Sequence, residues 1–233
     1  IHTYFFISYN IVTKIYRKCF KTSIISKAVY CSMIIAGGVL EKYFNQYTIN
    51  SKKVNEQVLF KILNKNKKCK YGKEYKFNSI KSINEYKSKV PITNYASYEK
   101  YIEEMLIGEK NILFTEDVEY FGHTSGTTGK QKLVPVTKKS REVGSKYMAL
   151  LLERFAYNNF KEQWNYGRGL MLADTVMTTY SQGGVPICSA TSGGMDSIKL
   201  ILPKIYTSPY EVMKIKDKNT ALYLHLLFAL EDK

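Results

Sequence analysis

The ten residues "HTSGTTGKQK", His123 to Lys132, offer few side chains that pack and many groups that bind anions. Together with Gly122 they hold three glycines, three threonines, a serine and two lysines. Glycines let main-chain N–H groups converge on one point, hydroxyls add hydrogen-bond donors, and lysines add positive charge. A polyphosphate requires these groups, so the stretch predicts a phosphate-binding loop. An exposed glycine turn without a ligand is the alternative.

The P-loop of NTPases, G-x-x-x-x-G-K-[ST], does not fit this stretch. Six residues rather than four separate Gly122 from Gly129, and Gln131 follows Lys130 where a P-loop has the hydroxyl that binds magnesium. A P-loop also leads directly into a helix. Here the Pro-containing segment "KLVPV" comes first, and the next helix is predicted to begin only at Thr137.

A strand, "TSGTTGKQK" and a second strand together resemble the phosphate-binding loop of the adenylate-forming superfamily, which includes acyl-CoA synthetases and luciferases. Within it, "KLVPVT" after the loop is similar to the auxin-responsive promoter family of acyl acid amido synthetases. So is "INEYKSKVPITNYASYEKYIEEMLIGEKNILFTEDVEYF" before the loop, and "YTSPYEV" followed by "ALYLHLLFAL" resembles a later segment of that family. The resemblance covers residues Asn50 to Lys233.

This resemblance implies roles for individual residues. Lys132 takes the place of the family's closing lysine and is the predicted catalytic residue, offsetting phosphate charge. His123 stands where the family more often has an apolar residue and is interpreted as a structural histidine rather than a ligand. No metal-binding side chain is implied. The predicted ATP-binding residues, which would hold the β and γ phosphates, are Thr124, Ser125, Gly126, Thr127, Thr128 and Gly129.

The resemblance also implies a reaction. With ATP and Mg²⁺, a small carboxylic acid would be activated to an acyl-adenylate, and an amine, commonly an amino acid, would then form the amide. An acyl-CoA ligase of the same superfamily is the alternative, and the acceptor that accelerates AMP release distinguishes the two. The family's adenosine motifs and C-terminal domain would lie after Lys233, so the 233 residues alone are predicted to be inactive.

The formal charge of +15 and the isoelectric point near 9.4 raise the question of an anionic partner. Nucleic acid is not expected as the partner. Arginine provides the bidentate contacts to bases, and in this sequence lysine far outnumbers arginine. A non-catalytic basic module on membrane or nucleic acid is the alternative from another class. Four separated cysteines, without a CxxC motif, indicate reduced thiols in a cytoplasmic protein. The protein is expected to be a monomer.

Residues 1–49 are predicted to form a helical extension of a domain that spans residues 50–233. "AVYCSMIIAGGVL", Ala28 to Leu40, carries no charge but is shorter than the ~20 apolar residues that span a bilayer. The extension is therefore predicted to pack on the domain. Weak contact of residues 1–40 with a membrane surface remains the alternative, because basic residues flank the apolar run.

Three short helices are predicted before the loop. Ser51 is expected to cap the first, whose apolar positions from Val54 to Leu63 follow helical spacing. Ser82 and Glu85 form a capping-box pair for the second, which must end before Pro91. The third is expected to have Ser97 as its cap, Gly108 as its stop, and an inner face of Tyr98, Tyr101, Ile102 and Met105.

Around and after the loop, strands are predicted at residues 111–115, 118–124 and 169–176, and "KLVPV" at residues 132–136 reads as a strand near a sheet edge because of its proline. Thr137 is expected to cap a long helix, residues 183–194 to form a loop or hairpin, and "ALYLHLLFAL" to form a core helix. The alternation of helices and strands predicts an α/β fold, with mixed layered sheets flanked by helices. This would be the N-terminal, incomplete part of the large domain of an adenylate-forming enzyme.

Overall fold

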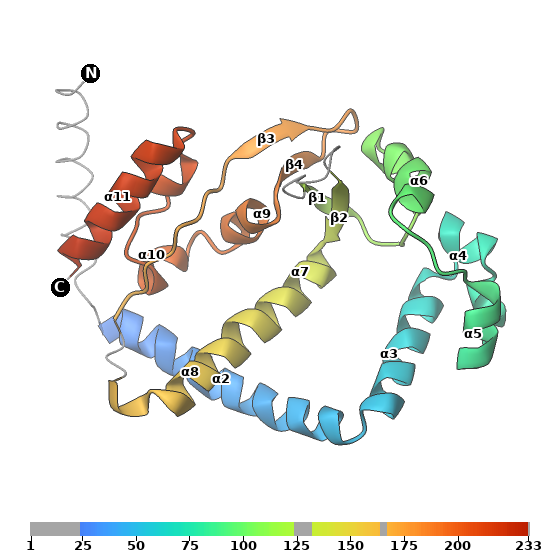
Figure 1. Ribbon diagram of the computed structural model, residues 1–233, viewed down its shortest axis with the longest axis horizontal. Coiled ribbons are helices and arrows are strands. Elements are labelled where there is room, and N and C mark those ends of the chain that lie inside the picture. The colour runs from blue at the N-terminus through green and yellow to red at the C-terminus, as the bar shows by residue number, and fades with distance from the viewer. Residues whose placement is uncertain (1–23, 124–131, 164–166, 233) are drawn as a thin grey trace.

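One mixed sheet of four strands lies at the centre of the part of the chain that the computed structural model describes, residues 24–123, 132–163 and 167–232. Its strand order is β2-β1-β4-β3 (Figure 1). β1 pairs antiparallel with β2 and parallel with β4, and β3 pairs antiparallel with β4. The strands are β1 Val118–His123, β2 Leu133–Thr137, β3 Met177–Tyr180 and β4 Pro186–Ser189.

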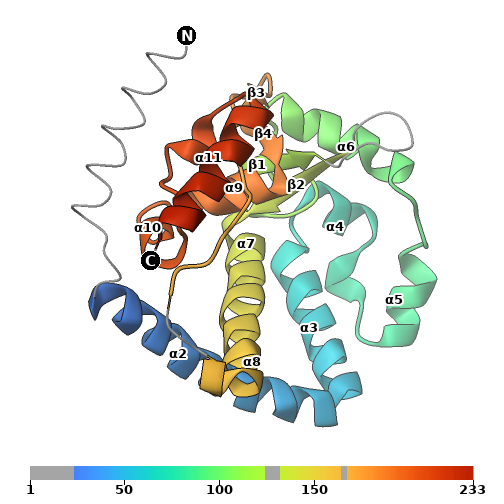
Figure 2. The same ribbon diagram turned by 60° about the vertical axis from the view of Figure 1, so that its left-hand side comes forward.

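Helices flank this sheet, so the predicted mixed α/β architecture is confirmed. Figures 1 and 2 show α3 to α6 grouped on one side of the sheet and α9 to α11 on the other, while α2 lies with α8 at the end of the molecule away from the sheet. The helical elements are α2 Ile24–Ile49, α3 Ser51–Asn66, α4 Lys70–Glu74, η1 Phe77–Ser79, α5 Ile83–Lys89, α6 Ala96–Leu106, α7 Lys138–Ser145, η2 Lys146–Leu151, α8 Leu152–Asn159, η3 Lys161–Gln163, α9 Ala190–Ser197, α10 Leu202–Ile205, η4 Val212–Lys214 and α11 Lys218–Glu231.

The main core lies between β1 and helices α3 to α6. Phe121 of β1 is fully buried in this cluster, together with Leu63 of α3 and Tyr101 of α6. Tyr71 is the centre of an aromatic group, with ring centroids 4.5 Å from Tyr75 and 5.5 Å from Tyr101. Burial raises the pKa of the Tyr71 and Tyr101 hydroxyls, so both stay neutral. This core holds β1, and hence the start of the predicted loop, against α6.

The predicted inner face of α6 is confirmed, since Tyr101, Ile102 and Met105 are buried and Tyr98 packs beside them. The stop at Gly108 is also confirmed, because this residue has φ +103°, the left-handed conformation that glycine adopts at least cost.

Of the three helix caps predicted before the loop, one is confirmed. The Ser82 hydroxyl accepts the Glu85 N–H at 3.2 Å, although the Glu85 carboxylate reaches the Lys81 N–H rather than closing a reciprocal box. The predictions of Ser51 and Ser97 as caps were wrong. Asn50 and Tyr95 occupy the N-cap positions of α3 and α6, and neither forms a side-chain cap bond. Each helix begins earlier than the hydroxyl suggested, so the serine lies within its first turn.

Residues 111–115 do not form the predicted strand. Asn111 has φ +59°, and the carbonyls of Asn111 and Ile112 accept from the N–H groups of Lys70 at 2.7 Å and Tyr71 at 3.0 Å. These are first-turn donors of α4, which lack partners within their own helix. Because the segment satisfies a helix N-terminus, its carbonyls are not available for a sheet ladder.

Residues 169–176 were also wrongly predicted as a strand, since β3 begins only at Met177. Their backbone pairs instead with the C-terminal part of the chain. Gly169 forms an isolated parallel bridge with Tyr206, and the Thr175 N–H donates to the Met213 carbonyl at 2.7 Å. Residues 183–194, predicted as a loop or hairpin, contain the end of the β3–β4 hairpin turn, β4 itself and the start of α9.

β2 lies at the sheet edge, as its proline predicted. The cap at Thr137 is confirmed, since its hydroxyl accepts the Ser140 N–H at 3.2 Å in a reciprocal capping box. The long helix predicted after it consists of α7, the π-helical η2 and α8, in direct succession.

α11 is only partly the core helix that its composition predicted. Ala221, Leu224, His225 and Phe228 are buried on one face. The opposite face is exposed to solvent within the described residues, because α11 packs mainly on η4 and on the segments around residues 173 and 208. The exposed apolar residues of this face are Leu222, Tyr223, Leu226 and Leu230.

Candidate functional site

The two strands that flank the predicted phosphate loop are direct partners. β1 ends at His123 and β2 begins at Leu133, and these residues pair across the antiparallel ladder. Residues 124–131 lie outside the described part of the chain. The predicted ATP-binding residues Thr124, Ser125, Gly126, Thr127, Thr128 and Gly129 therefore stay predictions, while the strands predicted on either side of them are confirmed.

Lys132, the predicted catalytic residue, immediately precedes β2 and is exposed. Its ammonium lies 5.5 Å from the centroid of the Tyr95 ring. The Tyr95 hydroxyl donates to the Leu133 carbonyl at 3.1 Å and accepts the Leu133 N–H at 2.8 Å. Tyr95 thus fixes the backbone next to Lys132 and offers the lysine an aromatic face. The cationic group is held at the entrance to β2, one residue from the strand pairing.

A helix N-terminus lies at the same edge of the sheet. Because β1 and β4 are parallel, their carboxyl ends coincide, and His123 pairs with Ser189. Ser189 caps α9, and its hydroxyl accepts the Ser192 N–H at 3.0 Å. In open α/β sheets, ligands bind at the carboxyl ends of strands, and a helix N-terminus there favours anions. The site therefore combines the end of β1, the start of β2 and the first turn of α9.

Glycines bring the first turns of α9 close to β1. A Cβ at Gly193 would lie 2.4 Å from the Tyr120 ring, and a Cβ at Gly122 would lie 3.5 Å from the Ala190 side chain. The Tyr120 hydroxyl donates to the Ala190 carbonyl at 3.3 Å, which fixes the ring beneath the helix. The "SGG" segment after β4 thus allows α9 to pack against β1. The prediction of a loop or hairpin at residues 183–194 did not include this role.

A buried polar network lies behind α9. The Ser192 hydroxyl, fully buried, donates to the Asp174 carboxylate. On the neighbouring residue, the Ala173 carbonyl accepts from Nε2 of His225 at 3.0 Å, and Nδ1 of His225 accepts from the Ser208 hydroxyl at 2.7 Å. A carbonyl can only accept, so the proton resides on Nε2 of a neutral ring. Burial lowers the pKa of His225 below its ordinary value.

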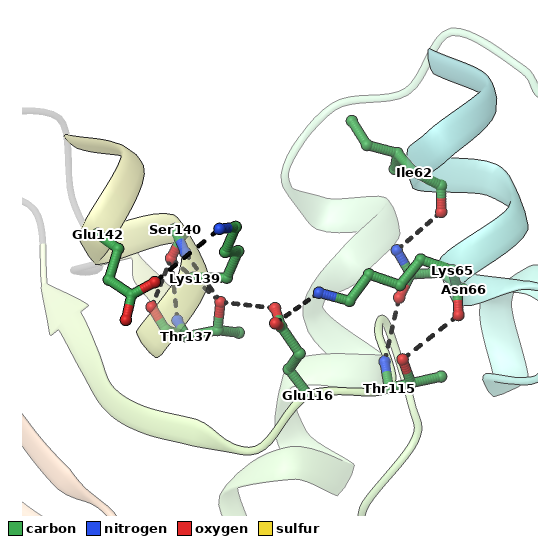
Figure 3. Close-up of polar contacts among 9 residues, drawn as sticks. All are labelled: Ile62, Lys65, Asn66, Thr115, Glu116, Thr137, Lys139, Ser140 and Glu142. Carbon is green, nitrogen blue, oxygen red and sulfur yellow. Dashed lines mark hydrogen bonds and ion pairs between the residues drawn. The ribbon is translucent and has the colours of Figure 1, made fainter. Parts of the chain in front are cut away.

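A second polar network lies at the C-terminal end of β2 (Figure 3). The Glu116 carboxylate accepts from the Thr137 hydroxyl at 3.0 Å and from the Lys65 ammonium at 2.5 Å. Asn66 receives the Thr115 N–H on its side-chain oxygen at 3.1 Å. The Lys65 hydrogen bond lowers the pKa of Glu116. The C-terminal end of α3 is thereby tied to the corner where β2 becomes α7.

The structure thus brings together Lys132, His123 and the carboxyl ends of β1 and β4. His123 is half-buried within β1, and its assignment as a structural residue stays a prediction. Sequence reasoning missed Tyr95, the α9 N-terminus and His225. A strand followed by "SATSGG" could have indicated the α9 cap, whereas no local pattern linked Tyr95 to a residue 38 positions later. Among the described residues, no three His, Cys, Asp or Glu side chains gather as a metal site.

Comparison with known proteins gives a consistent picture. A family model described as the GH3 family N-terminal domain matches residues 40–233. The chain is 27% identical over 203 residues to the probable indole-3-acetic acid-amido synthetase GH3.11 of Oryza sativa subsp. japonica, an alignment that covers 84% of this chain and 34% of that protein. It is 28% identical over 194 residues to the jasmonoyl–L-amino acid synthetase JAR6 of Nicotiana attenuata, covering 80% of this chain and 33% of that protein.

Among solved structures, a GH3.15 acyl acid amido synthetase superposes with a TM-score of 0.70 at 20% identity, covering 81% of this chain and 33% of that chain. This likeness shows the shared fold. The chain spans about a third of the length of the curated relatives it matches. The resemblance drawn from the loop and its flanking segments is confirmed, and because the family model covers most of the sequence, this chain belongs to the GH3 family.

Proposed function

We propose that this chain forms the N-terminal part of an ATP-dependent acyl acid amido synthetase. Such an enzyme joins a small carboxylic acid to an amine, commonly an amino acid. The main support is the pairing of His123 with Leu133, the described strand residues on either side of "TSGTTGKQ", and the pairing of His123 with Ser189, which caps the N-terminus of α9. The relatives named as amido synthetases of indole-3-acetic acid and jasmonate support the class of reaction.

The residues at this edge fit an anionic nucleotide. Between Tyr120 and Thr137 the sequence has no Asp or Glu, whereas it has Lys130, Lys132 and four hydroxyl side chains before Lys132. The N-terminus of α9, which directly follows the neighbouring strand β4, adds partial positive charge at the same edge of the sheet. Lys132, held beside Tyr95, would offset charge on the phosphates, and the loop amides would orient them. ATP with Mg²⁺ supplies the leaving group that makes a carboxylate reactive, through an acyl-adenylate.

The proposal predicts which acceptor the enzyme uses. For the longest gene product that contains this chain, AMP release with ATP, Mg²⁺ and a panel of carboxylic acids should accelerate on adding amino acids. Lys132→Gln should lower the rate by about 10²-fold or more, the scale of losing one transition-state contact. Lys139→Gln is the matched control and should keep the parent rate, because Lys139 is an exposed lysine of α7 whose ammonium lies 3.9 Å from Glu142.

Acceleration by CoA but not by amino acids would overturn the amide-forming assignment in favour of a thioester-forming ligase. An unchanged rate in Lys132→Gln would overturn the role given to this lysine. The 233-residue chain should show no ATP–pyrophosphate exchange, because it spans only about a third of the relatives' length. Strong exchange by the chain alone would show that the remaining two-thirds are not required for the activation step.

A further inference from the structure

A groove lies between α3 and η1, and the structure describes every residue that lines it. Its volume is about 740 Å³, within the roughly 300–1,000 Å³ that small-molecule sites occupy. Its apolar lining comes from Phe60 and Leu63 of α3 and from Phe77 and Ile80 at η1. Leu63, Phe77 and Ile80 are buried members of the main core, and Phe60 packs against that core. The apolar lining is therefore held in place by the folded core.

The backbone around η1 sets the shape of the groove. Lys76, which precedes η1, has φ +53°, a left-handed conformation that a non-glycine residue seldom adopts. The Ile80 N–H donates to the Phe77 carbonyl at 3.3 Å, and the Phe77 ring meets the Tyr71 ring edge-on with centroids 5.9 Å apart. A strained backbone persists where the surrounding packing holds it. The groove is therefore a preformed feature of the fold.

Three lysines and no carboxylate line this groove. Lys61, Lys67 and Lys81 are all exposed, and none of them forms an ion pair within the described part of the chain. The Lys67 ammonium donates to the side-chain oxygen of Asn64, another lining residue, at 2.8 Å. Cationic groups beside an apolar wall concentrate positive potential in the groove, because the wall has a low dielectric constant.

Carboxylates close to the groove are already paired with other lysines. Glu85 accepts the main-chain N–H of Lys81 at 2.8 Å, and its carboxylate lies 3.9 Å from the Lys89 ammonium. On α3 itself, Lys65 points away to Glu116 at 2.5 Å, toward the corner where β2 becomes α7 (Figure 3). The lysines of the groove therefore retain positive charge that no carboxylate of the described residues balances.

We propose that this groove binds a small organic anion with an aromatic or aliphatic body. The carboxylate of this ligand pairs with the three lysines, and its body lies against the apolar lining. Gln57, Asn64 and Asn78 also line the groove and offer amide hydrogen-bond donors. Neither an inorganic anion nor an uncharged ring would use both kinds of lining. Because no residue of the groove belongs to the candidate phosphate site, this proposal goes beyond the amido synthetase assignment.

Calorimetric titration of the 233-residue chain with 1-naphthoate, without ATP, tests this proposal. Naphthoate should bind saturably. Acetate, which lacks the ring, and 1-naphthalenemethanol, which lacks the charge, should each bind about ten-fold more weakly or worse. The double variant Lys61→Gln and Lys81→Gln should weaken naphthoate binding by about ten-fold or more. Lys199→Gln with Lys216→Gln removes the same formal charge from exposed lysines outside the groove, and this matched control should bind as the parent does.

Amide ¹H–¹⁵N correlation spectra of the same titration locate the ligand. Shifts should centre on residues 57–67 and 77–81, and Lys132→Gln should leave them unchanged, so this proposal can fail independently of the amido synthetase assignment. The proposal would be overturned by the absence of saturable binding, by shifts centred on β1 and α9, by equal binding of naphthoate and naphthalenemethanol, or by equal binding of naphthoate to the two double variants. An acidic, Phe-containing peptide that displaces naphthoate at about ten-fold lower concentration would assign the groove to a protein segment and would also overturn it.

Discussion

His225 is a buried residue whose hydrogen-bond partners restrict its protonation. Its side chain is 2% exposed, and both ring nitrogens are used, one accepting from Ser208 and the other donating to the Ala173 carbonyl. A protonated ring could not accept the Ser208 hydrogen bond and would place a charge in a buried region. Burial therefore lowers the pKa of His225 in the folded chain below the ordinary 6.5.

This gives a pH dependence of stability with a defined sign. The unfolded chain takes up a proton near pH 6.5 that the folded chain binds only at lower pH, so the free energy of unfolding should fall as the pH drops below about 6.5. One proton contributes at most about 1.4 kcal/mol per pH unit. Urea unfolding between pH 5.5 and 7.5 measures this slope, and His225→Gln, which keeps a donor and an acceptor, should remove most of it.

His123→Gln is the control, since it leaves the buried network intact and should retain the slope. If His225→Gln and the parent lose stability equally as the pH falls, His225 is not the group responsible. This pH dependence would report on the stability of the folded core and not on catalysis. His225 holds the segment that carries Asp174 behind α9, so a slope tied to it would also show how α11 supports the site.

At the scale of elements, the contact between α9 and β1 gives a matched pair of glycines. Gly193→Ala would place a methyl group 2.4 Å from the Tyr120 ring, which is buried and hydrogen-bonded to α9 itself. Overpacking of this kind costs about 1–3 kcal/mol. At Gly194 no atom lies within 4 Å of the added Cβ, so Gly194→Ala should be neutral or stabilise the helix by up to ~1 kcal/mol.

The midpoints of urea unfolding for the two variants compare these positions directly. A large loss for Gly193→Ala and none for Gly194→Ala would confirm that α9 is seated on β1 through residue 193. Similar behaviour of the two variants would mean that α9 packs differently. Because Ser189 caps this helix by accepting the Ser192 N–H, a displaced α9 would also move the N-terminus at the candidate phosphate site.

The sequence predicted best the local elements in which a single residue restricts the backbone conformation. Pro135 marks β2 as an edge strand, Thr137 caps α7, and Gly108 ends α6 with a positive φ. Residues 111–115 and 169–176 have equally strand-like side chains, but their carbonyl and N–H groups are used by α4 and by the residues around 206 and 213. Such long-range pairing is not encoded in the segment itself, so no local pattern could have excluded these strands.

The same limit applies to the site. The composition of residues 123–132 and their resemblance to a known loop indicated both the flanking strands and Lys132. Tyr95 and the α9 N-terminus enter the site only through the parallel pairing of β1 with β4 and the packing of α6 against β2. These partners are 38 or more positions from Leu133 in sequence, and only the folded topology brings them together.

At the scale of the whole molecule, the candidate phosphate-binding edge of the sheet and helix α2 lie apart in the described part of the chain. The carboxyl ends of β1 and β4 lie toward one end of the molecule, and α2 lies along the other (Figure 1). The exposed apolar face of α11 is a further surface, distinct from α2.

The central claim is that residues 124–129 with Lys132 bind a triphosphate. Amide ¹H–¹⁵N correlation spectra of the 233-residue chain, titrated with inorganic tripolyphosphate, test it most directly. The account predicts saturable shifts at Ser125 to Gly129, Lys132 and the first turn of α9, weakened in Lys132→Gln and unchanged in Lys139→Gln. Shifts confined to other lysine-rich surfaces, such as the groove lined by Lys61, Lys67 and Lys81, with the loop amides unmoved, would contradict it.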